Sequence, residues 1–332
     1  MRRKLKTVFV CEFITGGGLL GEDLPERLMA EGELMTQAVV RDFLALKRFH
    51  LIVARDPRLP SLDAFVDVVT VNREPWEQWV TCIQRADAVL AIAPETGGGL
   101  ERLNRLILAH DRVLLGCAPE AVAIAASKLA TAQRLAEREI SVVPTVALGA
   151  DLPASANGWT VKPDDGAGSE ETYILFASEA VKQRAQALFG RQFVVQPFLP
   201  GDPMSLSLLC TPRHVRVLAC NRQIQRRDGA SLRQDGVIVN GAAHKREQTT
   251  RLAEAILAAV PGLLGYVGVD FIDSVNGPVV LEINPRLTTA YAGLSQSLGV
   301  NAAELILRAC EGDEKVTAIS LDATPCRIER HC

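Results

Sequence analysis

The sequence predicts an α/β protein in which a Rossmann-like, doubly wound domain is followed by a mixed α+β part. Three observations carry this prediction: short apolar strands alternate with helical patterns up to about residue 118, antiparallel strand pairs follow, and an acidic hairpin lies at 265–286. The chain has 332 residues, of which 48% are hydrophobic, so it can bury two or three cores.

The N-terminal domain begins with a strand, a glycine turn and a helix. A continuous apolar run at 6–13 leads into glycines 16–18, and the next helical pattern covers about 34–46. This order is how a parallel α/β unit begins. Further strands are expected at 51–54, 66–71, 88–93 and 113–116, and further helices at 76–84 and 100–109.

Two glycine clusters, 16–18 and 97–99, follow the carboxyl ends of predicted strands. Open parallel sheets bind their ligands at this edge. Neither cluster matches G-x-G-x-x-G, so a dinucleotide is not indicated. Glu12 and Glu95 adjoin the clusters, and each is interpreted either as a group that orients a substrate or as a solvated loop acid.

Composition excludes several classes of partner. The net charge is −3 and there is no basic run, so neither nucleic acid nor an anionic membrane is expected as a partner. The first residues carry the charges of a secretory leader, but Glu12 breaks the apolar run, which we therefore expect to be the first strand. The eight cysteines are dispersed without a C-x-x-C, which indicates reduced thiols and a cytoplasmic protein.

The C-terminal tail, CRIERHC, brings Cys326, His331 and Cys332 close together in sequence. It lacks a fourth metal ligand in range, so we expect a frayed end rather than a metal site. The last periodic segment, 301–310, is expected to be a helix on the outside of the protein.

The middle of the chain predicts a second kind of architecture. A helix is expected at 127–139 with Ser127 as its N-cap, followed by a short strand at 159–163. The next loop, DDGAGSEET, has backbone N–H groups that can wrap a phosphate, and Lys162 adds a positive charge; an ordinary turn between strands is the alternative. Further strands are expected at 192–198, 205–211 and 215–221, and a helix at 248–259.

The acidic hairpin can be assigned a register from its sequence. With a three-residue loop at 275–277 and Gly277 in the left-handed region, Asp270 lies opposite Glu282. A two-residue turn would place these carboxylates on opposite faces among apolar side chains, so the three-residue loop is preferred. One face then carries Asp270, Glu282 and Asn284. The other carries Val267, Val269, Phe271, Leu281 and Ile283.

This polar face predicts a metal site. Two carboxylates held together repel each other unless a cation neutralises them, and oxygen ligands from Asp270, Glu282 and Asn284 suit Mg²⁺ or Mn²⁺. An ordinary hairpin with one solvated face is the alternative.

Four motifs in this order resemble the ATP-grasp ligases: ASKLAT, VKPDDGAGS, VQPFLPGD and the hairpin ending in EINPR. The resemblance covers about 118–294, and the preceding α/β unit is similar to that superfamily's N-terminal (pre-ATP-grasp) domain. It implies a two-lobed ATP-grasp module with the nucleotide between the lobes. The implied domains are 1–118, a small lobe at 119–191 and a large lobe with the metal site at 192–332.

The resemblance also implies cofactors and roles. ATP and two Mg²⁺ ions, with Mn²⁺ as a substitute, would be bound; Lys128 and Lys162 would hold the phosphates, and Arg286 would steady the transferred phosphoryl group. Many members bind the ribose through a Glu in a G-x-E stretch, for which Asp202 is the candidate here. The remaining roles fall to the phosphate loop, Gly166, Ala167, Gly168 and Ser169, to the adenine pocket, Gln196, Phe198 and Leu199, and to the metal ligands, Asp270, Glu282 and Asn284.

The activity implied is ligation of a carboxylate to an amine through an acyl phosphate. The stretches CEFITGGGL, APETGGGL and EINPRLTTAYAGL are most similar to the tyramine–glutamate ligases of methanofuran biosynthesis, which implies a γ-glutamyl amide as product. The expected partners are a small-molecule acid and amine, and a homodimer is left open. A carbamoyl-phosphate-type enzyme, a kinase and a non-catalytic ATP sensor are the alternatives.

If glutamate is the acid, its charged groups need binding partners. Arg286, Thr288 and Thr289 are candidates to hold them, with Glu12 or Glu95 receiving the ammonium group. Phe13 or Tyr291 is expected to wall the slot for an aromatic amine.

Overall fold

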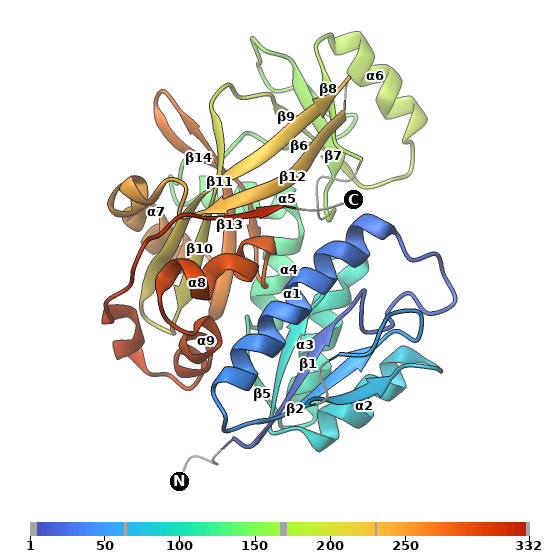
Figure 1. The fold of residues 1–332 in the computed structure, drawn as a ribbon. Coiled ribbons are helices and arrows are strands. Elements are labelled where there is room, and N and C mark those ends of the chain that lie inside the picture. Colours follow the sequence, from blue (N-terminus) through green and yellow to red (C-terminus); the bar gives the residue numbers. More distant parts are fainter. Residues whose placement is uncertain (1–4, 63–64, 167–170, 230, 330–332) are drawn as a thin grey trace.

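The computed structural model describes residues 5–62, 65–166, 171–229 and 231–329, and it contains two sheets (Figure 1). The first is a five-stranded parallel sheet in the N-terminal part, and the second is a ten-stranded antiparallel sheet formed by the rest of the chain. Together with the helices they confirm the predicted order of an α/β domain followed by an α+β module. None of the described helices is long and apolar enough to cross a membrane.

The parallel sheet has the strand order β3-β2-β1-β4-β5. Its strands are β1 (Thr7–Glu12), β2 (His50–Arg55), β3 (Asp67–Thr70), β4 (Ala88–Ile92) and β5 (Val113–Leu114). Helix α1 (Glu26–Ala45) covers one face, and α2 (Pro75–Arg85) and α3 (Gly99–Ala109) cover the other. Because side chains alternate along β1, Phe9 packs with Trp79 and Leu103 while Val8 packs with the α1 side.

The antiparallel sheet has the order β14-β13-β10-β11-β12-β8-β7-β9-β6, with β15 paired to β12. Its strands are β6 (Val146–Ala147), β7 (Trp159–Pro163), β8 (Tyr173–Leu175), β9 (Phe193–Pro197), β10 (Asp202–Cys210), β11 (Val215–Asp228), β12 (Ser231–Val239), β13 (Gly265–Ser274), β14 (Gly277–Asn284) and β15 (Cys326–Glu329). Its helices are α4 (Pro119–Ala126), α5 (Lys128–Ala136), α6 (Ser178–Ala187), α7 (Arg246–Ala259), α8 (Leu294–Leu298) and α9 (Ala302–Cys310). Short 3₁₀ turns are η1 (Thr96–Gly98), η2 (Ala243–Lys245), η3 (Thr289–Gly293) and η4 (Glu314–Ala318).

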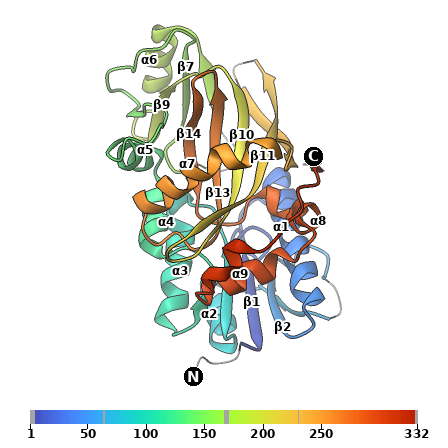
Figure 2. The same ribbon diagram turned by 90° about the vertical axis from the view of Figure 1, so that its left-hand side faces the viewer.

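This sheet consists of two parts with separate cores. Strands β6 to β9 and α6 enclose a small core that includes Val161, Val181 and Phe193, and among the described residues Ser231 and Tyr173 are the strand partners that join this part to β12. Since β9 pairs with β6 and β7, this part of the sheet reaches Pro197. In the large part α7 lies across one face (Figure 2), and η3 and α9 pack on the other.

The hairpin differs from its predicted geometry in an instructive way. Its turn has two residues, since Ser274 is paired with Gly277, and the predicted three-residue loop is therefore wrong. A β-bulge restores the register: Phe271 faces Val280, and Asp270 faces Glu282. The extra residue, Leu281, lines the cavity described below instead of joining the predicted apolar face. Gly277 has φ 105, as the prediction of a left-handed residue required.

Three segment predictions also need correction. Helix α1 begins at Glu26 rather than near residue 34. Helix α9 is not on the outside, because most of it is buried between α1 and the sheet strands β10 and β13. The tail is not frayed at 326–329, since β15 pairs with β12 and buries Cys326; His331 and Cys332 lie outside the described residues.

The N-cap of α5 was predicted correctly. The hydroxyl of Ser127 accepts the backbone N–H of Ala130 at 3.0 Å. Lys128 is the first residue of this helix, so the cap fixes where the lysine side chain starts.

The buried Asp42 joins α1 to the C-terminal helices and generates a stability prediction. Its Oδ2 accepts the hydroxyls of Tyr291 (3.0 Å) and Ser295 (2.6 Å). Asp42→Ala should lower the free energy of unfolding by roughly 2–4 kcal/mol, because the buried hydroxyl of Tyr291 and the partly buried hydroxyl of Ser295 lose their acceptor. Urea titration measures this, with Arg48→Ala as the control, since Arg48 forms an exposed ion pair with Glu304 at the same interface. Equal losses in both variants would contradict the prediction.

Candidate active site

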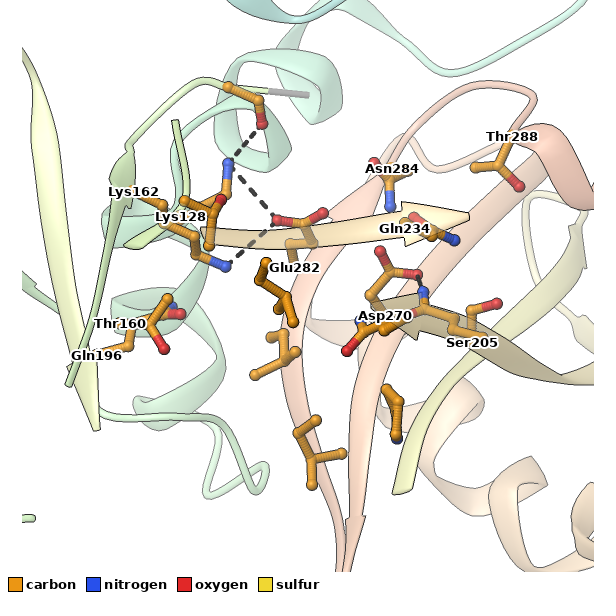
Figure 3. A pocket seen from close by; sticks show the side chains of 18 of the residues that line it. Lys128, Thr160, Lys162, Gln196, Ser205, Gln234, Asp270, Glu282, Asn284 and Thr288 are labelled. Atoms are coloured by element: carbon orange, nitrogen blue, oxygen red, sulfur yellow. Dashed lines mark hydrogen bonds and ion pairs between the residues drawn. The ribbon is translucent and has the colours of Figure 1, made fainter. Parts of the chain in front are cut away.

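A cavity of about 180 Å³ lies between the two parts of the antiparallel sheet (Figure 3). Its walls come from α5 and β7 on one side and from β10, β11, β13 and β14 on the other, and η3 and α1 contribute further residues. Side chains far apart in sequence therefore face one another across it.

Two lysines of one wall meet one glutamate of the other. The Nζ atoms of Lys128 and Lys162 lie 3.5 and 3.6 Å from Oε2 of Glu282. Lys162 points into the cavity because its neighbour in β7, Val161, is directed into the small core. Burial lowers the pKa of Lys162, and the Glu282 carboxylate opposes this shift.

Lys128 has a second set of contacts. Its Nζ donates hydrogen bonds to the backbone carbonyls of Asp164 (3.2 Å) and Gly166 (2.8 Å). The backbone N–H of Leu129 donates to the Asp164 carboxylate at 2.9 Å. The start of α5 is thus bonded to the loop that follows β7.

Asp270 and Glu282 form an acid pair on neighbouring strands. Burial opposes ionisation of Glu282, but Lys128 and Lys162 outweigh it and lower its pKa. For Asp270, burial and then the charge of Glu282 raise the pKa. Gln223 donates to Asp270 Oδ1 at 2.9 Å without adding charge. Both lysine ion pairs are formed with Glu282, and the pKa of Asp270 stays raised although the charge of Lys162 opposes that shift.

This arrangement fits a divalent cation. Among the described residues no group of three or more His, Cys, Asp and Glu side chains forms a metal cluster, so any metal here rests on two carboxylates and the Asn284 amide. Such oxygen ligands suit Mg²⁺ or Mn²⁺. A cation beside Asp270 would lower its pKa, opposing the effects of burial and of the Glu282 charge.

Arg286 is bound to the N-terminal domain. Its Nε lies 2.9 and 3.0 Å from the two carboxylate oxygens of Glu95, and its Nη2 donates to Oε2 at 2.9 Å. The two side chains are 10% and 7% exposed. Burial lowers the pKa of Arg286, but the carboxylate of Glu95 outweighs it, so the net shift is upward.

The N-terminal domain also contributes Glu31, which lines the cavity from α1. Its Oε1 accepts the hydroxyl of Thr289 at 2.6 Å. Thr288 and the Tyr266 hydroxyl share a hydrogen bond of 2.8 Å nearby. This end of the cavity combines an acid, a guanidinium and hydroxyl groups.

Most predicted site residues described in the structure lie in this one cavity. Those that line it are Lys128, Lys162, Gly166, Gln196, Phe198, Leu199, Asp270, Glu282, Asn284, Arg286, Thr288 and Thr289. Asp202 does not line it: the residue is exposed at the start of β10, between Gly201 and Pro203, which do line it. Ala167, Gly168 and Ser169 lie outside the described residues.

Several candidates for substrate contacts lie elsewhere. Glu12 is buried and its carboxylate accepts the N–H groups of Ile14 and Thr15, so it is neither a solvated acid nor part of the cavity. Glu95 is not solvated either, because it binds Arg286. The rings of Phe13 and Tyr291 do not line the cavity: Phe13 packs on Trp76 and Trp79, and the Tyr291 hydroxyl donates to Asp42. The predicted aromatic slot from these two residues is wrong.

Sequence reasoning missed some of the cavity's polar residues. They are Glu31, Thr160, Ser205, Gln223, Gln225 and Gln234. The signal for Gln223 and Gln225 was the polar alternation at 221, 223 and 225, which continues β11 beyond its predicted end. For Glu31 the chain offers no local signal, because its position depends on how α1 packs.

The same segments match known family models. Residues 125–290, half of the chain, match the model of the ATP-grasp domain, and residues 49–122 match that of the pre ATP-grasp 3 domain. The chain belongs to the ATP-grasp family. The family predicted from the sequence is thereby confirmed, and the named relatives below are ligases, as expected.

Individual ATP-grasp relatives are similar over most of the chain. Tyramine–L-glutamate ligase of Methanocaldococcus jannaschii is 25% identical over 298 residues, covering 87% of this chain and 85% of that protein. A Xanthomonas oryzae pv. oryzae protein named "Probable alpha-L-glutamate ligase" is 27% identical over 239 residues, 67% of this chain and 77% of that one. A solved structure of an ATP-grasp superfamily protein from Archaeoglobus fulgidus has a TM-score of 0.73 and 23% identity, covering 98% and 92%.

The contacts of Lys128 generate a prediction about the mobility of the loop after β7, which can be tested without any ligand. Lys128→Met should speed amide hydrogen exchange in the segment 160–166, because the carbonyls of Asp164 and Gly166 lose their donor. Lys162→Met is the matched control, since Lys162 bonds to Glu282 and not to this loop. Mass spectrometry of the exchanged peptides measures the exchange rate in both variants. Unchanged exchange in Lys128→Met would show that the hydrogen bonds of Lys128 do not hold this loop.

Proposed function

We propose that this chain is an ATP-dependent ligase that joins a carboxylate to an amine through an acyl phosphate, releasing ADP and phosphate. The observation that carries the proposal is the meeting of Lys128 and Lys162 with the acid pair Asp270 and Glu282 across one cavity. A triphosphate with a divalent cation complements this arrangement, because it brings negative charge to the lysines and positive charge to the acids.

The roles follow from these positions. Lys128 and Lys162 bind the phosphates, and Asp270, Glu282 and Asn284 hold Mg²⁺, for which we propose two ions with Mn²⁺ as a substitute. When bound, the metal neutralises charge on the β- and γ-phosphates. Gly166 lies beside the phosphates, and the stretch with Gln196, Phe198 and Leu199 lines the adenine pocket. Asp202, which adjoins the lining residues Gly201 and Pro203, is the candidate for the ribose contact.

The chemistry requires no nucleophile from the protein. An oxygen of the substrate carboxylate attacks the γ-phosphorus, the bond to the departing ADP oxygen breaks, and a mixed anhydride forms. The amine nitrogen then attacks the activated carbonyl carbon, loses a proton, and phosphate leaves with the electron pair of the broken C–O bond. Arg286 steadies the transferred phosphoryl group during both steps, and the cavity walls exclude water that would hydrolyse the anhydride.

For the substrates we propose glutamate and tyramine, joined as γ-glutamyltyramine in a methanofuran-type pathway. The similarity to the tyramine–L-glutamate ligase of M. jannaschii supports this pair. The cavity supplies a physical reason: Glu31 can take the α-ammonium group, and the hydroxyl of Thr288 can donate to the α-carboxylate. Glu31→Gln should then raise the KM for glutamate and leave that for ATP unchanged; equal KM values for glutamate would exclude this role.

The domain organisation is also proposed. The N-terminal α/β domain comprises 1–118, the small lobe begins at 119 and the large lobe ends at 332. The separate core of β7, β9 and α6 supports a small lobe that extends to Pro197.

The substrate assignment is tested by one reaction mixture. Enzyme, ATP, Mg²⁺, glutamate and tyramine should release ADP and yield a product with the mass of the amide. A screen of other acid and amine pairs runs alongside as the control. If another pair gives ADP and an adduct while glutamate and tyramine give neither, the ligase assignment stands and this substrate pair is excluded.

The acid pair generates a mutational prediction. Asp270→Asn and Glu282→Gln should each lower kcat about 100-fold or more, because even outer contacts of metal ligands are worth about 10–100-fold, and Lys162→Met should also raise the KM for ATP. Asp273→Asn is the matched control: it lies on the same strand and pairs with Lys245, away from the cavity. Near wild-type rates in the three site variants would mean that the hairpin holds no catalytic metal.

A further inference from the structure

The ion pair of Glu95 and Arg286 joins two domains inside the site. The pair is nearly buried, and 191 residues separate its members in sequence. Removing two charges from water costs more than an ion pair usually returns, so stability alone is a weak reason for it. Its geometry points instead to a role in fixing the orientation of the Arg286 guanidinium.

The pair restricts which N–H groups of Arg286 face the cavity. A guanidinium has five N–H donors in a fixed plane. Three are used among the described residues, by Nε and Nη2 toward Glu95 and by Nη1 toward the Leu287 carbonyl at 3.3 Å. With its plane fixed on one side by a carboxylate, the group presents the remaining two donors in one orientation.

Glu95 belongs to a turn that the glycine cluster makes possible. Gly97 and Gly98 have φ values of 63 and 71, in the left-handed region that side chains disfavour, and α3 begins directly after them at Gly99. The glycines thus form a tight reversal at the carboxyl end of β4. In this structure the cluster shapes the turn.

The same turn also contacts the loop that follows Lys162. The hydroxyl of Thr96 donates to the Asp165 carbonyl, and the N–H of Gly97 donates to the Asp165 carboxylate, each at 3.0 Å. Glu95, Thr96 and Gly97 therefore touch both walls of the cavity, the strand end that carries Arg286 and the loop beside Lys162.

We propose that Glu95 is a positioning residue, and that the turn formed by residues 95–97 is the element through which the N-terminal domain orients Arg286 toward the transferred phosphoryl group. The inference rests on the proposed function, because it assigns Arg286 to that group. Glu95 itself does not line the cavity in which we place the nucleotide and the acid. Substitution of Glu95 should therefore weaken stabilisation of the phosphoryl-transfer transition state and leave the ground-state affinity for ATP unchanged.

The test compares Glu95→Gln and Glu95→Asp with a matched control, Glu33→Gln. Glu33 forms a two-bond ion pair with the buried Arg55 in the same domain, away from the cavity. Two affinities are measured by calorimetry for the full-length protein, those for Mg²⁺ with a non-hydrolysable ATP analogue and for Mg²⁺, ADP and aluminium fluoride, which mimics the transferring phosphoryl group. The kcat for ADP release is measured in parallel.

Glu95→Gln should lower kcat and weaken the aluminium fluoride complex about ten-fold or more, with the affinity for the ATP analogue changed less than about two-fold. Glu95→Asp should recover part of both losses, and Glu33→Gln should lower the melting temperature without either effect. Equal losses for both nucleotide complexes, or a Glu95→Gln variant that behaves like Glu33→Gln, would overturn the inference. Suppose instead that Glu95→Gln weakens the aluminium fluoride complex and not the ATP-analogue complex, while the wild type turns over no acid and amine. The proposed reaction then fails, and the positioning role of Glu95 stands.

Discussion

The structure depends on one electrostatic constraint, the burial of two carboxylates side by side. Asp270 and Glu282 face each other because a bulge at Leu281 corrects the register of a two-residue turn. Lys128 and Lys162 both form ion pairs with Glu282, while burial and the charge of Glu282 raise the pKa of Asp270, which a nearby cation would lower. Because the lysines stand on α5 and β7, the constraint also draws the small part of the sheet against the large part.

The N-terminal domain completes this cavity rather than simply preceding it. It supplies Glu31 from α1 and Glu95 from the turn after β4, and both reach residues that follow the hairpin of β13 and β14. The carboxyl edge of a parallel sheet is where such folds place functional side chains. Here the strand end at residues 95–99 contacts a site that is built largely by another domain. The strand end at residues 12–18 does not, because Glu12 is buried and bonded within its own turn.

Much of the site could be predicted from the sequence because its signals are local. Period-two alternation directs Lys162 and Val161 to opposite faces of β7. The polar alternation of the hairpin predicted that Asp270 and Glu282 share a face, although a bulge at Leu281 and not the expected three-residue loop brings them together. What failed was long-range: the Glu95 contact to Arg286, the buried position of α9 and the pairing of β15 depend on which segments meet in the folded chain. The two aromatic residues expected in the cavity are used instead for packing, Phe13 against tryptophans and Tyr291 against Asp42.

The central claim is that this arrangement transfers a phosphoryl group to a carboxylate. The most direct measurement uses an acid substrate labelled with ¹⁸O in the reacting carboxylate, followed by mass spectrometry of the released phosphate. An acyl phosphate requires one ¹⁸O atom to appear in phosphate for each amide formed. Phosphate free of ¹⁸O, with amide formed at the normal rate, would contradict the account.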